Sequence, residues 1–264
     1  MKIATLNINS INARLTNLMF WLQKYQPDVM LLQEIKAEFN NFPFFDLKTI
    51  GYDAKVLGQK SNNGVAVLSK HPIIGAQENI PDFTDENARY LETEIKINNI
   101  SYTIASLYVP NGNPPQNNPL DKSRYLYKLN WLDSFISHAQ KLFLTKENII
   151  LGGDFNIIMT DNDVYNPHLF NGGVLMNKEV QNKLQALSLC GYRDLYRNCF
   201  PDKAGYTFWD YMAGSLQNDL GMRIDYLFTS PSVSDRCLSC GVDREFRHME
   251  KSSDHTILWA DFKE

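Results

Sequence analysis

The sequence predicts an α/β fold in which two packed β-sheets are covered on their outer faces by helices. Short buried strands alternate with longer amphipathic helical segments, the strands fall in two successive groups, and no linker-like change of composition separates the groups. With 264 residues, 44% of them hydrophobic, the chain is long enough to bury a sizeable core. We therefore expect one domain over residues 1–264.

The first group of predicted elements forms a βαβ unit. Residues 2–6 are predicted as a strand, the helix that follows ends at Pro27 because proline lacks a backbone N–H, and residues 29–32 form a second buried strand. A parallel connection of this kind places Asn7 and Glu34 side by side at one edge of a sheet. Antiparallel strands are then predicted at residues 53–57, 65–69 and 91–97.

The second group contains the longest predicted helix. A strand at residues 101–108 comes first, and apolar residues then recur at helical spacing over about residues 122–144. The elements predicted after this helix are a strand at residues 149–151, a helix capped by Asn177 and closed by Gly191, a strand at residues 222–228 and a last strand at residues 256–262.

The chain is organised around the stretch IILGGDFN at residues 149–156. Its three branched apolar residues predict a strand buried on both faces, and the two glycines let the backbone turn where the strand ends. Asp154 and Asn156 then lie at the carboxyl end of a strand, where α/β sheets bind their ligands. Alternatively, the stretch is a tight turn in which Asp154 bonds its own backbone.

Other polar residues also fall at predicted strand ends. Glu34, Tyr108 and His255 do so, although each has a simpler interpretation as a solvated carboxylate, an ordinary sheet tyrosine or a surface residue. Asp225 interrupts an otherwise apolar strand, where a carboxylate is costly unless it is paired, and His255 is its candidate partner. We expect the polar strand ends to meet at one rim of the two sheets.

Side chains of this kind, gathered at one rim, predict the hydrolysis of a phosphate ester. Oxygen ligands predominate and the set holds a single histidine and no cysteine, which favours Mg²⁺, or Mn²⁺, over tetrahedral zinc. Asp154 would orient or deprotonate the attacking water, while Asn156 and His255 would donate hydrogen bonds to the developing charge. Asp225 would fix the imidazole tautomer. The predicted rim residues are Asn7, Glu34, Tyr108, Asp154, Asn156, Asp225, Asp254 and His255.

Composition limits the partners and the compartment. The net charge is −4, so a polyanionic partner must be held by a local basic patch and by metal ions rather than by overall charge. The four cysteines are too few for a disulfide framework, and the pair Cys237 and Cys240 is a weak metal signal, so we expect reduced cysteines. Without a signal peptide or an apolar stretch long enough to span a bilayer, the chain is expected in the cytoplasm, with no membrane partner.

Six short motifs follow one another from the first predicted strand to the last. They are NIN at residues 7–9, LQEIK at 32–36, YVPNG at 108–112, GGDFN at 152–156, RIDY at 223–226 and SDH at 253–255. In this order they resemble the exonuclease III family of abasic-site endonucleases, within the DNase I-like endonuclease/exonuclease/phosphatase superfamily, and the FWDY stretch at 208–211 is similar to its DNA-repair branch. The resemblance implies a four-layer α/β sandwich.

The resemblance also implies an activity and the roles of several residues. The activity is Mg²⁺-dependent hydrolysis of duplex DNA 5′ to an abasic site, with 3′→5′ exonuclease and 3′-phosphatase activities at duplex ends, carried out by a monomer. Glu34 matches the metal ligand, and Asp154 matches the residue that handles the attacking water, although the family's base has been assigned to this aspartate, to the tyrosine or to the histidine. The residues that match assisting metal ligands are Asn7, Asp154, Asn156, Asp254 and His255.

DNA contacts are implied in the same way. Tyr108 and Asn111 match residues that contact phosphate. Phe208, Met222 and Ile224 match an apolar pocket that accepts an extrahelical baseless sugar, which leaves Trp209 as part of the scaffold. The candidate basic surface consists of Lys36, Lys60, Arg89, Lys122, Arg124 and Arg223.

Some positions depart from the family pattern without removing a ligand. Ser10, Ile35 and Thr256 replace residues usual in the motifs, which puts rate and preference in question rather than the chemistry. The segment 165–175 is expected to shape the contact with DNA, and the loop 113–119 to close over a substrate. Two alternatives stay open: a relative that hydrolyses another phosphoester, such as RNA, sphingomyelin or an inositol phosphate, and a non-catalytic protein that binds nucleic acid.

Overall fold

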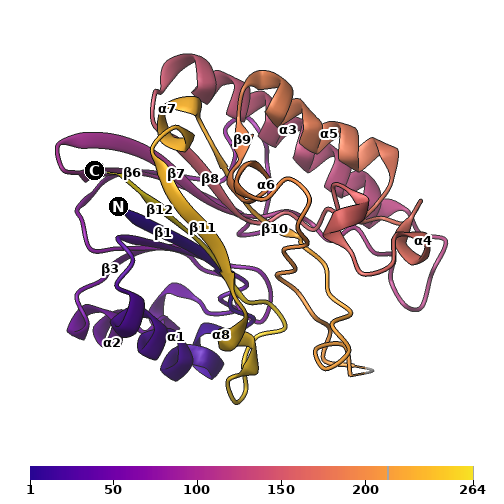
Figure 1. Cartoon of the computed structure of the whole chain (residues 1–264), viewed down its shortest axis with the longest axis horizontal. Helices are drawn as coiled ribbons and strands as arrows, with labels where there is room; N and C mark the ends of the chain where they lie inside the picture. The colour runs from indigo at the N-terminus through magenta and orange to yellow at the C-terminus, as the bar shows by residue number, and fades with distance from the viewer. Residues whose placement is uncertain (213, 264) are drawn as a thin grey trace.

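The computed structural model describes residues 1–212 and 214–263 and arranges them in four layers (Figure 1). Within this part of the chain, two six-stranded mixed sheets pack face to face, and helices cover their outer faces. One sheet carries α1 (Ile11–Tyr25) and α2 (Phe44–Thr49), and the other carries α3 (Ser123–Thr145) and α5 (Lys178–Cys190). The predicted α/β sandwich of two sheets flanked by helices is confirmed.

The first sheet is built around the predicted βαβ unit. In it, β1 (Lys2–Asn7) pairs in parallel with β2 (Val29–Gln33), and α1 connects them. The strand order is β11-β12-β1-β2-β4-β3, and the antiparallel members are β3 (Asp53–Leu57), β4 (Val65–Ser69), β11 (Cys237–Asp243) and β12 (Ile257–Phe262). The sequence does not predict β11, because this edge strand is only partly buried and lacks an apolar run.

The second sheet repeats this plan. Here β7 (Ile100–Tyr108) pairs in parallel with β8 (Ile149–Asp154), and α3 connects them. The strand order is β5-β6-β7-β8-β10-β9, and the antiparallel members are β5 (Ile73–Glu78), β6 (Tyr90–Ile97), β9 (Arg193–Asp194) and β10 (Asp225–Thr229). Asp225 was predicted to interrupt a strand. Instead it is the first residue of β10, and so it lies at the rim of the sheet.

Most remaining helical segments in the described residues are short turns of the connecting loops. They are η1 (Phe39–Asn41), η2 (Asp161–Asp163), α4 (Pro167–Phe170), α6 (Leu195–Cys199), α7 (Pro231–Ser234) and α8 (Arg244–His248). The longer α5 has the predicted ends: the Asn177 side chain accepts from two backbone N–H groups, and Gly191 adopts a left-handed conformation. No helix among the described residues has the length and apolar character needed to cross a membrane.

Three apolar layers join the four structural layers. Between the sheets, residues such as Ile3 and Leu31 of the first pack against Ile150 of the second, and two further clusters join each sheet to its own helices. The glycines of the central stretch allow close packing between the sheets, at Gly152, and between neighbouring strands, at Gly153, and they do not form the predicted turn. Both lie within β8, where a Cβ atom on Gly152 would come within 2.6 Å of Leu31 and one on Gly153 within 1.9 Å of the Leu107 carbonyl oxygen.

Candidate active site

Polar strand ends from both sheets meet at one rim of the sandwich. Asn7 ends β1, Tyr108 ends β7 and Asp154 ends β8, while Glu34 directly follows β2. The strands next to these parallel pairs run the opposite way, so they bring the starts of β10 and β12 to the same rim. Asp225 therefore pairs across from Asp154, and His255 precedes β12.

Asp154 takes part in a local turn and in the rim at the same time. Its Oδ1 accepts the backbone N–H of Asn156 at 2.9 Å, as the tight-turn interpretation requires, and Asn156 adopts a left-handed conformation with φ 50°. Its Oδ2 accepts from the side-chain amides of Asn7 at 2.9 Å and Asn156 at 3.3 Å. Burial raises the pKa of Asp154 to about 7, and the nearby His255 charge opposes that shift.

His255 and Asp225 form the predicted pair. The Nδ1 atom of His255 lies 2.8 Å from Asp225 Oδ2, and Thr207 donates its hydroxyl to the same oxygen at 2.6 Å. Burial alone would lower the pKa of His255, but the charge and hydrogen bond of Asp225 raise it to about 10. The imidazole is therefore protonated at neutral pH, and its Nε2 lies 3.7 Å from Asp154 Oδ2.

Glu34 is the most accessible of three carboxylates at the rim. Its side chain is 19% exposed, against 2% for Asp154 and 0% for Asp225. Asn7 donates to Oε1 at 2.8 Å, and Lys36 lies 2.8 Å from Oε2. Although burial opposes it, these hydrogen bonds, with a third from Tyr108, hold the pKa of Glu34 below its ordinary value. Glu34 is therefore ionised and partly open to solvent.

The rim contains a group of side chains that could hold a metal ion. Ligand atoms of Asp154, Asp225 and His255 all lie within 4.8 Å of one another. Since the imidazole is protonated and bonded to Asp225, it is a poor ligand, and the better donors are the oxygens of Asp154 and of the ionised Glu34. The buried Asp225 Oδ1 atom has no hydrogen-bond partner among the described residues, which adds negative potential to the site.

Two predicted metal ligands, Asn7 and Asp254, have side-chain oxygens that accept hydrogen bonds from other protein groups. The Oδ1 atom of Asn7 accepts the backbone N–H of Asn9 at 3.1 Å, so the amide presents its nitrogen, not its oxygen, to Glu34 and Asp154. Asp254 is half-buried and accepts from the Asn9 side chain at 3.1 Å and from the Ser253 hydroxyl at 3.3 Å. Asn7 thus bonds two carboxylates of the rim, and Asp254 bonds Asn9 and Ser253.

The apolar residues predicted to form a sugar pocket do lie together. Phe208 pairs by backbone bridges with Met222 and with His255, and its ring packs edge-on against the imidazole with 5.0 Å between centroids. Met222 and Ile224, however, are only 8% and 3% exposed, because they belong to an apolar cluster against which residues of the 165–175 segment pack. Phe208 is the partly open member of this cluster. Trp209 is fully buried, as expected for scaffold.

The predicted basic surface needs one correction. Arg223 is only 1% exposed, and its guanidinium bonds Asp163 and Asp194 at 2.7 Å each, so it belongs to a buried ion cluster rather than to a surface. Lys36 is occupied by Glu34 and by Asn9. Arg89 lies with its guanidinium 4.7 Å from the centre of the Tyr108 ring. The residues of the predicted surface that are exposed are Lys60, Lys122 and Arg124.

Three residues that sequence reasoning missed support the site. Thr207 bonds Asp225, Asp163 binds Arg223, and Lys128 on α3 donates to the backbone carbonyl of Asn156 at 2.6 Å. Burial lowers the pKa of Lys128 to about 7, and the Asp154 charge opposes that shift. A signal for Lys128 was present, because a lysine stands on the apolar face of an amphipathic helix.

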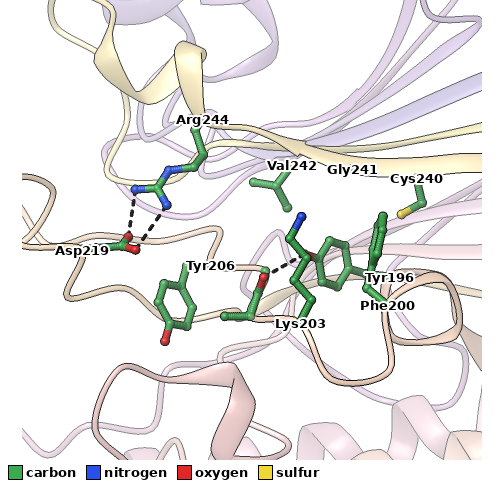
Figure 2. Close-up of a pocket in the computed structure, with 11 residues that line it drawn as sticks. Tyr196, Phe200, Lys203, Tyr206, Asp219, Cys240, Gly241, Val242 and Arg244 are labelled. Carbon is green, nitrogen blue, oxygen red and sulfur yellow. Dashed lines mark hydrogen bonds and ion pairs between the residues drawn. The ribbon is translucent and has the colours of Figure 1, made fainter.

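A separate cavity of about 330 Å³ lies away from the rim (Figure 2). Its wall includes Tyr196 and Tyr206, and Arg244 bonds Asp219 at its edge with 2.9 Å between Nη2 and Oδ1. The Tyr196 hydroxyl is satisfied by the Ala204 carbonyl at 2.9 Å. None of the predicted site residues lines this cavity.

A family model described as the Endonuclease/Exonuclease/phosphatase family matches residues 4–255, which include every side chain of the rim. The chain belongs to this family. Among its relatives in the family, exodeoxyribonuclease III from Haemophilus influenzae is 30% identical over the full length of both chains.

Solved structures agree with this assignment. An AP endonuclease from Archaeoglobus fulgidus is 31% identical and superposes with a TM-score of 0.92 over the full length of both chains. The 3′ phosphatase NExo from Neisseria, solved with a product DNA hairpin, is 29% identical with a TM-score of 0.93, again over both full lengths. The predicted family, the DNase I-like fold and the enzyme class, a nuclease that hydrolyses phosphodiesters, are thereby confirmed.

Proposed function

We propose that this chain is a magnesium-dependent DNA-repair phosphodiesterase that cleaves duplex DNA 5′ to abasic sites and removes nucleotides or phosphate from 3′ ends. The observation that carries the proposal is the rim itself, where the Asp225–His255 pair faces Asp154 at 3.7 Å beside an ionised Glu34. Relatives named for abasic-site cleavage, exonuclease and 3′-phosphatase activity support the same choice.

In the proposed reaction, Asp154 orients the attacking water. The raised pKa of its carboxyl suits it to take a proton from that water near neutral pH. Protonated His255 then donates from Nε2 to the phosphoryl oxygen as negative charge develops, and Asp225 holds the imidazole in place through Nδ1. The Asn156 side-chain amide donates to the Val109 carbonyl and to Asp154, so it would have to give up one of these bonds to donate to the phosphoryl oxygen as well. The Tyr108 hydroxyl, which bonds Glu34, would be a further donor.

A divalent cation fits the donor set of this rim. Glu34 would hold it together with Asp154, because these are the oxygen donors best placed to share one hard ion. When bound, Mg²⁺ or Mn²⁺ polarises the phosphoryl oxygen and stabilises the departing oxygen. The Asn7 amide, which bonds both carboxylates, would keep them at the same edge of the site.

The DNA backbone would run past Asn111. A groove of about 500 Å³ beside Asn111 is lined by Arg89 and Arg124, which supply positive charge to a chain whose net charge is negative. Such contacts fix the register of the duplex without reading its sequence. We also propose that residues 1–264 act as one domain, as a monomer and in the cytoplasm.

One observation favours 3′-end processing as the larger of the proposed activities. Met222 and Ile224 would have to line a pocket for an extrahelical sugar, yet both are buried in an apolar cluster against which residues of the 165–175 segment pack. A 3′ terminus needs less room than a flipped internal nucleotide, since the strand ends there. Cleavage at abasic sites would then require this segment to move.

The test uses three labelled duplexes: one with a tetrahydrofuran abasic analogue, one with a 3′-phosphate at a nick, and one with an ordinary recessed 3′ end. Each is incubated with Mg²⁺ or with EDTA, using the wild-type chain and the Asp154→Asn variant. We expect Mg²⁺-dependent products that the variant does not form, with 3′-phosphate removal fastest. A folded wild-type chain that leaves all three intact would refute the proposal, and RNA and small phosphate esters would be tried next.

A further inference from the structure

Lys128 is a buried lysine that the proposed reaction does not use. It lies on the inner face of α3 between Tyr125 and Leu132, its side chain is fully buried, and no carboxylate among the described residues forms an ion pair with it. Burying an ammonium group without a partner charge is costly, so its hydrogen bonds must offset that cost.

The ammonium group donates to three backbone carbonyls on three separate segments. The acceptors are Asn111 at 3.2 Å, Asn156 at 2.6 Å and Val174 at 3.0 Å. Asn111 follows β7, Asn156 follows β8, and Val174 belongs to the segment that packs on Met222. In its protonated form the Lys128 side chain has three N–H groups, one for each of these acceptors.

Two of these acceptors belong to residues that already touch each other at the rim. Asn111 donates its side-chain amide to Asn156 Oδ1 at 3.2 Å, while Asn156 donates to the Val109 carbonyl at 3.0 Å and to Asp154. Lys128 therefore bonds the backbone of both Asn111 and Asn156, the two residues whose side chains bond each other beside Asp154. Gly112 packs on the lysine stem so closely that a Cβ atom there would lie 2.9 Å from Lys128 Cδ.

The third acceptor connects this pair to the apolar cluster. Leu175 and Met176, next to Val174, pack with Phe208 and Met222, and the Leu175 carbonyl accepts from the Ile158 N–H at 2.8 Å. Two hydrogen bonds thus help to place the 171–176 segment. One joins the backbones of Leu175 and Ile158, in the loop after β8, and the other joins the Val174 carbonyl to Lys128.

We propose that Lys128 is a positioning residue, which fixes Asn111, Asn156 and the 171–176 segment relative to Asp154 so that the scissile phosphate and the sugar beside it are aligned together. The inference rests on the proposed function. Lys128 touches no substrate in this arrangement, so its loss lowers kcat by misplacing Asn156 and leaves DNA affinity nearly unchanged. A displacement of about 1 Å at a reacting group can cost on the order of 100-fold in rate.

The test compares Lys128→Met with Lys141→Met, an exposed lysine on the same helix whose side chain is 67% exposed. On whichever duplex the wild type cleaves, we expect Lys128→Met to lower kcat about 10- to 100-fold with KM changed less than about threefold. The control should match the wild type, and Lys128→Arg, which keeps the charge and several donors, should recover part of kcat. A variant indistinguishable from the control, or one changed only in KM, would overturn the proposal.

Hydrogen–deuterium exchange separates this inference from the proposed function. In Lys128→Met, amides in residues 109–113, 155–158 and 171–177 should exchange faster together, while those of β1 and β2 stay as in the control. If the wild type cleaves no duplex, the proposed function fails and this readout still tests Lys128. Unchanged exchange in all three segments would refute the positioning role. Should Lys128→Met not fold, Lys128→Arg carries both measurements.

Discussion

Two buried clusters of carboxylates lie close together in this chain and differ in how their charge is balanced. In the ion cluster, Asp163 accepts from Arg223 at 2.7 Å and from Arg197, and Arg223 also bonds Asp194 at 2.7 Å. Although burial opposes it, these guanidinium groups hold the pKa of Asp163 below its ordinary value. The charges of this cluster are matched inside the protein.

The proposed catalytic cluster, formed by Asp154, Asp225 and His255, carries more negative than positive charge. Asp154 and Asp225 share the single charge of His255, the pKa of Asp154 rises to about 7, and the buried Asp225 Oδ1 lacks a partner among the described residues. Such an arrangement costs stability and is characteristic of a site prepared for an ion or a substrate. Buried charges that are paired inside the protein stabilise its structure, whereas unpaired charges at an accessible rim indicate a functional site.

The ion cluster nevertheless serves the catalytic one. Arg223 lies two residues before Asp225, and its backbone N–H donates to the Asp163 carbonyl at 2.7 Å. Anchoring Arg223 therefore fixes where β10 begins and hence where Asp225 meets His255. The two clusters should respond to mutation in opposite ways.

The largest expected effect is on the rate of Asp225→Asn. Losing the carboxylate removes the partner that orients and charges His255, and the loss of such an aspartate costs about 10⁴-fold in rate elsewhere. We expect kcat to fall by orders of magnitude while the unfolding temperature changes little, measured on the 3′-phosphate duplex and by thermal denaturation. A variant with near-wild-type kcat would mean that His255 is oriented by another group.

Asp163→Asn should show the reverse. Breaking a buried charge pair by removing one partner costs about 3–5 kcal/mol in the free energy of unfolding, because the guanidinium groups of Arg223 and Arg197 lose their shared carboxylate. Urea denaturation measures this, with Asp161→Asn as the matched exposed control. Folded Asp163→Asn should keep most of its kcat. If it instead lost kcat as completely as Asp225→Asn while staying equally stable, the division between the clusters would be wrong.

Glu34→Ala tests whether a metal ion binds beside the catalytic cluster. Mutating residues that hydrogen-bond metal ligands typically lowers metal affinity about 10- to 100-fold. Removing a ligand itself should therefore raise the Mg²⁺ concentration for half-maximal rate by at least about this factor. Mg²⁺ titrations of cleavage rate would measure it, with the exposed Glu38→Ala as control. Full activity at ordinary Mg²⁺ would remove Glu34 from the ligand set.

The smallest expected effect is on the pH dependence of stability. The pKa of Asp154 is about 7 in the fold and near 3.8 when unfolded, so the folded chain retains a proton that the unfolded chain has lost, and this carboxyl makes stability fall as pH rises from about 4 to 7. Asp163 has the opposite sign: its contribution is present above 3.8 and is lost as pH falls through its lower folded pKa. In metal-free buffer, Asp154→Asn should therefore gain stability relative to the wild type between pH 5 and 7. If the difference in unfolding free energy between Asp154→Asn and the wild type stayed the same from pH 5 to 7, the raised pKa of Asp154 would be refuted.

Sequence reasoning succeeded where a standard connection determines which residues lie side by side. The βαβ unit placed Asn7 beside Glu34 correctly, and their side chains bond at 2.8 Å. It failed at β11, a partly buried edge strand without an apolar run. It also failed at Arg223, which was predicted to lie on the surface but bonds two aspartates that lie 29 and 60 residues away.

The sequence by itself determined the elements and their polar ends, because strand and helix periodicity and the motifs around Asp154 and His255 are local properties of the chain. Only the tertiary structure decided how charge is distributed among those ends. Whether a carboxylate is matched, like Asp163, or left short of partners, like Asp225, depends on burial and on groups brought from distant segments. Lys128 shows the same dependence, since its three acceptors meet only when β7, β8, the 171–176 segment and the long helix have packed.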